Sequence, residues 1–551
     1  MRPFAVAPVL AAVLAGTLAA PPAQAAPPPT AHDTTTAAEA RRVDRVPAAA
    51  LKWFPCRLTF ECATLPVPLD YDKPELGTTP VALIRAKATD PAKRIGALVV
   101  NPGGPGGSGM DMVAPSFLGL PLEPYFSEAV RERFDIIGFD PRGLGESENI
   151  RCLRSATEQN EMLAPMNAGE PLTPAAEQAW MGAATAFGKA CAKNAGKLAG
   201  RIHTAQVARD MDVLRRALGE AKLNYYGISY GSVLGQYYAN MFPDRFRALA
   251  IDGIIDADDW VGPRKGAVTP LMPRMGSAQA TVDSHQALWK RCAEVGAGRC
   301  PLLAHGDPAV VFDRVASHLR VQPVEIEGMR ITYQNFTSMA IFLMYDPSTA
   351  TMFAEITAGL YELISAEATE RGRERTTRAL RTAAELRAGY ENAIDLTGGV
   401  ACVDGRHPKL DTMPAHGADA EKAYGHVGRN FSWRVAICGK GAWKVAGKAV
   451  YAGPFDRRTA APVLVVGNTK DPVTHVRNSA SVAGQLPGSY HLVSDNWGHG
   501  AYPNSSCAAE RIDQYLISGT KPAPTGCVGD VQPFDEEGAP SNRFRMPSLL
   551  G

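Results

Sequence analysis

The part of the sequence that most restricts the possible folds lies near its middle, at residues 223–240. An apolar run at 223–228 leads into the pentapeptide GISYG, which centres on Ser229, and helical spacing follows up to Asn240. A Gly-x-Ser-x-Gly turn between a strand and a helix brings two backbone segments close together, so the positions beside the serine need glycine. The turn predicts a serine raised above a sheet edge, at a helix N-terminus that favours negative charge.

The rest of the chain supports a parallel sheet around this turn. Short apolar runs alternate with helical patterns, and strands that are apolar on both faces are typical of a parallel sheet covered on both sides. The predicted strands are 97–101, 134–140, 223–228, 248–252, 462–467 and 489–493, and helices are predicted at 204–218 and 229–240. Together with the serine turn, this pattern predicts an α/β-hydrolase fold, with a mostly parallel central sheet flanked by helices.

The alternation of strands and helices stops between residues 256 and 455. This region is mainly helical in pattern, with long helix-forming runs at 352–366 and 376–394. We therefore predict a large helical cap at 256–455, inserted after the fourth to sixth core strands and lying over the active site. The two parts of the core are then 46–255 and 456–551.

The N-terminal segment predicts export. Arg2, an apolar run of small residues and the triplet Ala23-Gln-Ala25 follow the pattern of a signal peptide at 1–25; a membrane anchor is the alternative, for which the run is short. Residues 26–45 are rich in Pro, Thr and Ala, which predicts a disordered linker or pro-segment. Since no later segment has the apolar length of a membrane-spanning helix, we expect a secreted protein.

Cysteine content and charge add two constraints. The ten cysteines are even in number, so disulfides are expected in an exported chain; the sequence leaves their connectivity open, and nearest-neighbour pairing would give 56–62, 152–191, 292–300, 402–438 and 507–527. Neither a CxxC pair nor an HExxH helix is present, and we expect no metal and no cofactor. With 57 Lys and Arg against 56 Asp and Glu, nothing indicates nucleic acid or stable membrane association. We expect a monomer.

The serine needs a base, because an alcohol is a poor nucleophile until its proton is removed. In the α/β-hydrolase chain order the serine is followed by an acid and then by a histidine. Asp471 comes shortly after the strand at 462–467, and His499 comes shortly after the strand at 489–493. We predict a catalytic triad of Ser229, Asp471 and His499, in which the carboxylate orients the imidazole and stabilises its charged form.

The acid and the base of the predicted triad each have a competing interpretation. Asp471 could cap a helix that begins near Val473, and His499 could be an ordinary loop histidine. Asp495 and His475 are the nearest alternatives for the acid and the base. The order and spacing of the three residues favour the triad as predicted.

A hydrolase of this kind also needs N–H donors for the oxyanion that forms during the reaction. The segment 101–109, NPGGPGGSG, follows the first predicted strand, which is the position of the oxyanion loop in this fold. We predict that the backbone N–H groups of Gly104 and Tyr230 are the two donors. A phosphate-binding loop is the alternative, but the segment lacks the Gly-Lys-Ser/Thr ending.

These motifs resemble those of a known enzyme group. The segment 102–107, PGGPGG, resembles the HGGPG loop of prolyl iminopeptidase-type α/β-hydrolases, and 140–147, DPRGLGES, resembles their D-x-R-G-x-G-x-S loop. Pro102 replaces the first histidine of that loop, as in a secreted subgroup. Through CATLPVPLDY at 62–71, YYGISYGS at 225–232 and the segment 462–527, the chain more closely resembles the secreted tripeptidyl aminopeptidases of actinobacteria. The resemblance spans residues 50–530 and is weakest in the cap.

The resemblance implies a secreted serine exopeptidase that releases short peptides from free N-termini, with the same triad. Its peptide substrate carries an α-ammonium group, which favours buried carboxylates in the cap. Asp404, Glu355 and Glu362 are the candidates, and an ordinary solvated position is the competing interpretation of each. A secreted esterase or lipase on the same scaffold is the alternative function, and a binding protein with an inactive site is a third.

Overall fold

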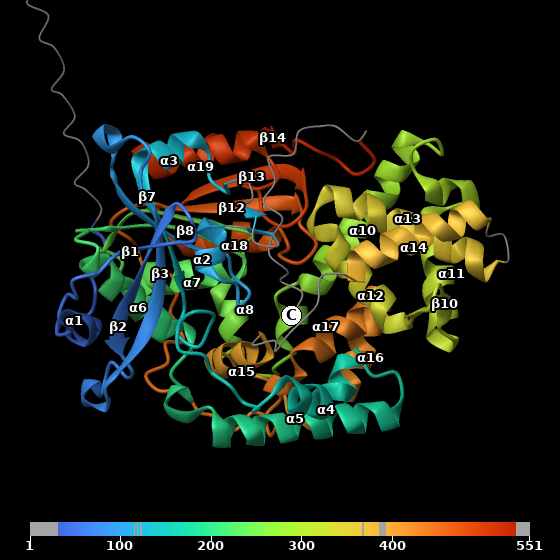
Figure 1. The fold of residues 1–551 in the computed structure, drawn as a ribbon, viewed down its shortest axis with the longest axis horizontal. Coiled ribbons are helices and arrows are strands. Elements are labelled where there is room, and N and C mark those ends of the chain that lie inside the picture. Colours follow the sequence, from blue (N-terminus) through green and yellow to red (C-terminus); the bar gives the residue numbers. More distant parts are fainter. Residues whose placement is uncertain are drawn as a thin grey trace, which may run out of the picture.

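A ten-stranded sheet forms the centre of the molecule (Figure 1). The computed structural model describes residues 31–114, 116–117, 120–121, 124–365, 369–384 and 393–535. The strands of this sheet are β1 (Phe54–Cys56), β2 (Phe60–Pro68), β3 (Thr78–Ala86), β4 (Gly96–Asn101), β7 (Phe134–Asp140), β8 (Leu223–Ile228), β9 (Phe246–Asp252), β12 (Val463–Lys470), β13 (Tyr490–Trp497) and β14 (Cys527–Val528). Two small sheets pair β5 (Ser116–Phe117) with β6 (Leu120–Pro121) and β10 (Val324–Ile326) with β11 (Met329–Ile331).

The order of the strands matches the predicted fold class. The sheet runs β1-β2-β3-β7-β4-β8-β9-β12-β13-β14. All neighbours from β7 to β14 are parallel, whereas β1, β2, β3 and β7 pair antiparallel. Each strand predicted from an apolar run is present in the sheet. β4 and β8 are buried along their whole length, which explains why their sequences are largely apolar. The strands β1 to β3 were not predicted; β2 has a partly exposed face and so lacks a continuous apolar run.

Helices cover both faces of the sheet. One apolar cluster joins the sheet to α2 (Gly109–Val113), α3 (Glu128–Arg133) and α19 (Ser506–Ser518). The other joins it to α1 (Ala37–Asp44), α6 (Thr204–Ala217), α7 (Tyr230–Met241) and α18 (Arg477–Gln485). Figure 1 shows α3 and α19 on one side of the sheet and α6 and α7 on the other. The helices predicted at 204–218 and 229–240 are thus α6 and α7.

The segment expected to be a disordered linker, 26–45, contains the helix α1. The carboxylate of Glu39 accepts hydrogen bonds from Nε and Nη2 of Arg209, at 2.8 and 2.9 Å. Val43 of the same helix is fully buried against the sheet. Composition predicted disorder because the segment has few apolar residues, but a long-range ion pair and one buried valine hold this helix in place. The predicted signal peptide, 1–25, lies outside the described residues.

The cap lies beside the carboxyl end of the sheet and is mainly helical, as predicted (Figure 1). Its helices are α8 (Ala257–Val261), α9 (Leu271–Arg274), α10 (Ser277–Val295), α11 (Pro308–Val321), α12 (Tyr333–Phe342), α13 (Pro347–Ile364), α14 (Glu370–Ala384), α15 (Ala393–Asp404), α16 (Met413–Tyr424) and α17 (Gly428–Arg434). The run predicted at 352–366 falls on α13. The run at 376–394 falls on α14 and the start of α15, and residues 385–392 lie outside the described residues.

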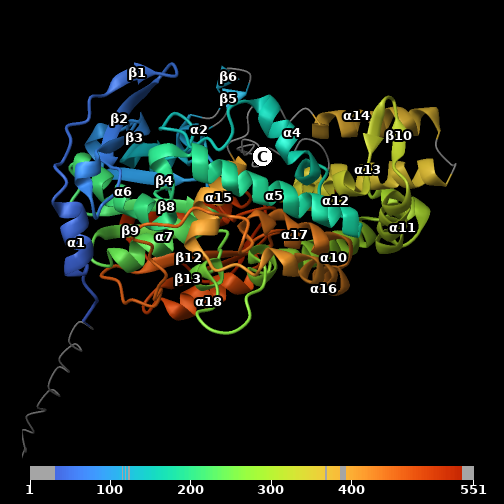
Figure 2. The ribbon, with the colours of Figure 1, turned by 90° about the horizontal axis from the view of Figure 1, so that it is seen from below.

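A second insertion extends the cap. The helices α4 (Ala156–Asn167) and α5 (Pro174–Asn194) lie between β7 and α6 in sequence, within the part predicted to be core. They nevertheless pack against the cap, as Figure 2 shows for α5 beside α15 and α17. Arg429 of α17 pairs with Glu177 of α5, and the rings of Trp180 and Trp433 meet edge to face at 5.3 Å. Helical periodicity alone could not assign α4 and α5 to one layer or the other.

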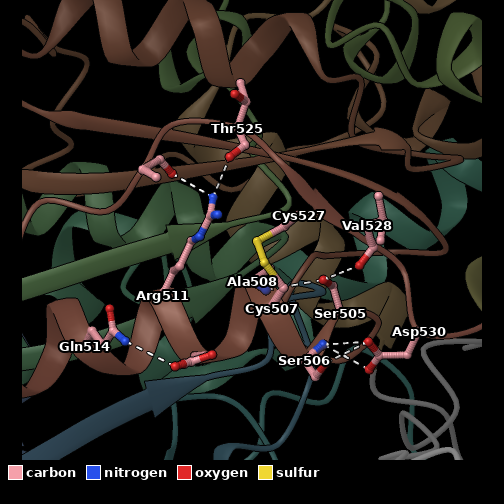
Figure 3. The surroundings of a disulfide bond; sticks show 12 residues. Ser505, Ser506, Cys507, Ala508, Arg511, Gln514, Thr525, Cys527, Val528 and Asp530 are labelled. Carbon is pink, nitrogen blue, oxygen red and sulfur yellow. Dashed lines mark hydrogen bonds between the residues drawn. A yellow bond between two sulfur atoms is a disulfide. The ribbon is translucent and has the colours of Figure 1, made fainter.

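Five disulfides are present, so the expectation of disulfides is confirmed; of the pairings that the sequence left open, the structure has the nearest-neighbour one. Figure 3 shows the bond between Cys507 and Cys527, which links α19 to β14. Beside it, the carboxylate of Asp530 accepts hydrogen bonds from the backbone N–H and the hydroxyl of Ser506. Within the described part of the chain, no helix combines the length and apolar character needed to cross a membrane.

Candidate active site

Ser229 lies in a sharp turn between β8 and α7. Its φ of 62° and ψ of −126° are rare for a residue other than glycine, and such strain is concentrated at functional sites. Its N–H donates to the main-chain carbonyl of Asp252, at 3.0 Å. A Cβ on Gly227 would collide with the carbonyl oxygen of Gly231. The steric reason for glycine on both sides of the serine is therefore present in the structure.

Asp471 and His499 form a buried pair. Oδ2 of Asp471 lies 2.8 Å from Nδ1 of His499, and neither side chain is exposed. The same carboxylate accepts hydrogen bonds from Oγ1 of Thr474 at 2.7 Å and from the N–H groups of Thr474, Val473 and Gly500 at 2.8, 3.0 and 3.0 Å. Burial opposes ionisation, but the nearby charge of His499 and these hydrogen bonds outweigh it and lower the pKa of Asp471.

The His499 ring lies at the end of the strand that leads to Ser229. A Cβ built on Gly253 would be 3.2 Å from Cε1 of His499 and 3.5 Å from Cγ1 of Ile228. Nε2 of His499 is buried and makes no hydrogen bond within the described residues, to Oγ of Ser229 or to any other atom. Catalytic hydrogen bonds are often long in free enzymes and shorten when substrate binds. The Asp–His pair is thus present, and the complete triad stays a prediction.

The predicted oxyanion loop lies against the serine turn. A Cβ on Gly103 would be 2.8 Å from Cβ of Ser229 and 2.9 Å from the backbone nitrogen of Tyr230. Within the described residues, the N–H groups of Gly104 and Tyr230 donate to no protein acceptor. Both predicted donors therefore belong to segments that meet at Ser229, and their role as oxyanion donors stays a prediction.

The two alternative residues lie in other surroundings. Asp495 is largely exposed and pairs with Lys470. Nε2 of His475 contacts Oδ2 of Asp283, at 3.0 Å. Neither hydrogen-bonds to Asp471 or forms part of the Asp–His pair, so the geometry favours the triad as first predicted.

Asp404, predicted to bind a substrate N-terminus, lies in a buried network at the end of α15. Its carboxylate accepts hydrogen bonds from N–H and Oγ1 of Thr204, at 3.2 and 2.5 Å, and from Nε1 of Trp260, at 3.0 Å. Oγ1 of Thr204 also lies 2.6 Å from the hydroxyl of Tyr230. Burial raises the pKa of Asp404 to about 6. The network connects the cap to the residue that follows Ser229.

The other two predicted carboxylates lie on α13. Glu362 lies near two basic side chains, with Nε2 of His305 at 3.4 Å and Nη2 of Arg375 at 3.9 Å. Glu355 is half-buried, two turns earlier on the helix. Their roles in binding substrate stay predictions.

The sequence did not single out Glu170, which is buried in the cap between α4 and α5. Oε1 accepts a hydrogen bond from Oγ1 of Thr337 at 2.7 Å, and Oε2 accepts one from Nδ2 of Asn430 at 3.0 Å. Within the described residues, no cation lies within ion-pair distance of it, and burial raises the pKa of Glu170 to about 7. It follows a glycine and precedes a proline, a pattern typical of an exposed turn, so the sequence carried no signal for it.

The cap contacts the predicted base directly through Tyr345. The carbonyl oxygen of Tyr345 accepts a hydrogen bond from the N–H of His499 at 2.9 Å, and the two rings meet edge to face at 5.0 Å. Burial raises the pKa of both Tyr345 and Glu170, and the charge of Arg434 offsets part of that rise in each. Arg434 thus interacts electrostatically with both Glu170 and the cap residue that contacts His499.

The described residues contain one close group of potential metal ligands, Cys152, Cys191 and Asp395. The two cysteines are joined in a disulfide, and Asp395 accepts a hydrogen bond from the N–H of Cys152. The group therefore offers no thiolate, and we assign no metal to it.

A strained serine at the tip of a parallel sheet, with a buried Asp–His pair at the same edge, defines a serine hydrolase with the α/β-hydrolase fold. Comparison with family models agrees: residues 96–276 match the alpha/beta hydrolase fold and residues 423–527 match the TAP-like protein family. The serine protease Hip1 of Mycobacterium tuberculosis is 30% identical over 516 residues, which cover 86% of this chain and 90% of that protein.

Two further relatives complete the comparison. Tripeptidyl aminopeptidase of Streptomyces lividans is 28% identical over 93% of each chain. A protein named carboxylesterase B, from Mycobacterium tuberculosis, is 30% identical over 84% of this chain and 85% of its own length. The chain belongs to this family of TAP-like α/β-hydrolases, which confirms the resemblance found in the sequence.

Proposed function

We propose that the protein is a serine exopeptidase that cleaves peptide bonds near free N-termini through an acyl-enzyme on Ser229. The observation that carries the proposal is the buried 2.8 Å contact between Asp471 and His499 beside the strained serine. Because Nδ1 of His499 is occupied by the carboxylate, Nε2 is the atom left for proton transfer. Two relatives named as peptidases support a peptide substrate, which the fold alone does not define.

The proposed reaction has two halves. Nε2 of His499 takes the proton of Ser229 as Oγ attacks the peptide carbonyl, and Asp471 stabilises the imidazolium. The N–H groups of Gly104 and Tyr230 stabilise the oxyanion, whose collapse breaks the C–N bond as the imidazolium protonates the leaving amine. A water molecule, deprotonated by the same ring, then releases the acyl group and restores the serine.

For the α-ammonium group of the substrate, the structure adds Glu170 to the three predicted candidates. Asp404 already accepts three hydrogen bonds from the protein, and Glu362 lies beside His305 and Arg375. Glu170 accepts hydrogen bonds only from neutral donors, and the charge of Arg434 offsets the cost of its burial only in part. We place Glu170 first among the candidates, ahead of Asp404, Glu355 and Glu362.

An esterase is the second candidate function. The observation in its favour is the relative named carboxylesterase B, which matches this chain over a similar share of its length. Ester and peptide hydrolysis use the same serine and the same oxyanion donors, so the residues described above do not separate the two. The distinction depends on whether the cap binds a charged N-terminus.

A panel of three substrates tests the proposal: a tripeptide amide chromogen with a free N-terminus, its N-acetylated form and a short-chain nitrophenyl ester. We expect turnover of the free peptide, at least tenfold less of the blocked one, and none by Ser229→Ala. Glu170→Gln raises KM for the free peptide more than Asp404→Asn, Glu355→Gln or Glu362→Gln do, and leaves ester KM unchanged. Turnover of the ester alone would favour the esterase, and peptide turnover by Ser229→Ala would contradict the triad.

We also propose that the protein is exported and monomeric. Five disulfides support an oxidising compartment, since such bonds are rare in the reducing cytosol. The sequence pattern of a signal peptide at residues 1–25 supports the same compartment.

A further inference from the structure

One buried residue contacts both the nucleophile turn and the histidine loop. Asp252 is the last residue of β9, and neither the proposed reaction nor substrate binding uses it. Its main-chain carbonyl oxygen accepts the N–H of Ser229, at 3.0 Å. Its side chain is fully buried and points to the loop that follows His499.

The carboxylate of Asp252 accepts hydrogen bonds from backbone N–H groups of that loop. The N–H of Ala501 lies 2.9 Å from Oδ1 and 3.0 Å from Oδ2, and the N–H of Tyr502 lies 2.9 Å from Oδ2. Gly253 N–H donates to Oδ1 at 2.7 Å, and the hydroxyl of Tyr226 donates to Oδ2 at 3.0 Å. Both oxygens thus accept more than one donor, which suits a carboxylate and no neutral side chain of that size.

The loop has little freedom to shift around these bonds. A Cβ on Gly500 would collide with Cδ1 of Ile228 and would lie 3.6 Å from Oδ2 of Asp252, so the loop packs directly on the nucleophile strand. Oδ2 of Asp471 accepts the N–H of Gly500, at 3.0 Å. Two carboxylates therefore hold three consecutive N–H groups, those of residues 500 to 502, immediately after His499.

We infer that Asp252 is a positioning residue that sets the separation between Ser229 and His499. Its backbone holds the serine turn and its carboxylate holds the histidine loop, so one residue connects the two reacting side chains. Within the described residues, no cation pairs with it, and neutral donors alone satisfy its charge. The inference rests on the proposed catalytic roles of Ser229 and His499.

Asp252→Asn tests the inference because it keeps the shape and removes one acceptor oxygen. Whichever way the amide turns, its NH₂ group faces at least one backbone N–H of Ala501 or Tyr502, and the loop must move. We expect kcat to fall by about 10- to 100-fold with KM within about twofold, since small misplacements of catalytic groups have effects of that size. The rate of labelling of Ser229 by a small fluorophosphonate should fall in parallel.

Asp513→Asn is the matched control. Asp513 is buried and contacts the same loop, but it accepts a hydrogen bond from the side-chain hydroxyl of Tyr502, at 2.8 Å, and not from its backbone. We expect its kcat and labelling rate to stay within about threefold of the wild type. Asp252→Asn with wild-type kcat and labelling, or an equal loss in both variants, would overturn the inference.

Hydrogen exchange of the wild-type protein provides a measurement that needs no variant. The amides of Ala501 and Tyr502 should exchange far more slowly than those of exposed loops, and rapid exchange at both would also overturn the inference.

Fluorophosphonate labelling needs no peptide substrate. A protein that labels rapidly but cleaves no peptide would contradict the proposed function and leave the role of Asp252 testable.

Discussion

At the scale of single residues, buried carboxylates around the site differ in what surrounds them. Asp471 lies beside His499, and the interaction lowers its pKa in spite of burial. Asp404 and Glu170 have only neutral donors, and burial raises their pKa to about 6 and about 7. The same functional group is therefore held charged at one position and closer to neutral at two others.

The raised pKa of Glu170 predicts a pH-dependent contribution to stability. Its pKa is about 7 in the folded protein and 4.5 ordinarily, so between these values the folded state binds more protons than the unfolded one. Stability from this group is complete below pH 4.5 and is lost as the pH rises to 7, by about 3 kcal/mol. Glu170→Gln should therefore gain stability relative to the wild type between pH 4 and pH 8, measured by urea unfolding.

The control is Glu75→Gln, the same change at an exposed position. We expect the difference between this variant and the wild type to stay constant over the same pH range. If Glu170→Gln and Glu75→Gln gave parallel curves, Glu170 would not carry a raised pKa.

The residues that sequence alone predicted are those with a local signature. Ser229 has the glycines of its turn, and Asp471 and His499 have the chain order of the fold. Glu170 and Asp252 have no such signature, because their roles depend on segments far away in sequence: Thr337 and Asn430 for one, and the loop after His499 for the other.

At the scale of elements, helix α1 shows what a buried ion pair contributes, beside the more exposed pair between Asp44 and Arg245. Arg209 is 1% exposed, and its guanidinium forms two hydrogen bonds with Glu39. Burial alone would raise the pKa of Glu39, but Arg209 outweighs it and lowers the pKa. Arg209→Met would leave this buried carboxylate with only Arg42, its more exposed partner, so we expect a loss of about 3 kcal/mol in the free energy of urea unfolding at pH 7.

Two variants make that prediction specific. Arg209→Met combined with Glu39→Gln removes both charges and should recover most of the loss. Arg42→Met removes a more exposed partner of Glu39 and should cost less than about 1 kcal/mol. A single Arg209→Met variant as stable as the wild type would show that the pair does not hold α1.

Elements were predictable where burial was uniform. The central strands are apolar throughout, so their positions follow from the sequence, and α13 has a long helix-forming run. The helices α4 and α5 were assigned to the core because periodicity reports which face is buried but not against which layer. Their true partners, through Trp433 and Arg429, come more than two hundred residues later.

At the scale of the whole molecule, the disulfides strengthen different parts. Cys402–Cys438 closes 36 residues within the cap, next to Asp404, and Cys507–Cys527 closes 20 residues at the edge of the sheet (Figure 3). Replacing each pair by serine should cost about 4 and about 3 kcal/mol, from the loop lengths. Of these two bonds, only Cys402–Cys438 lies in the cap, so of the two replacements only its loss should raise KM.

Two double variants check this prediction by thermal unfolding and steady-state kinetics. They are Cys402→Ser with Cys438→Ser, and Cys507→Ser with Cys527→Ser. Similar losses of stability with a change of KM in the first alone are the expected result. Equal changes of KM in both would mean that the disulfides act on substrate binding only through overall stability.

The hydrogen bond between Tyr345 and His499 has a consequence for how a polypeptide reaches the serine. It joins the cap to the backbone N–H of His499, so a movement of the cap away from the sheet would displace the proposed base. This bond favours the proposed cleavage near a chain terminus over cleavage in the middle of a long chain. We expect proteins with free, flexible termini to be cleaved and folded proteins with buried termini to remain intact.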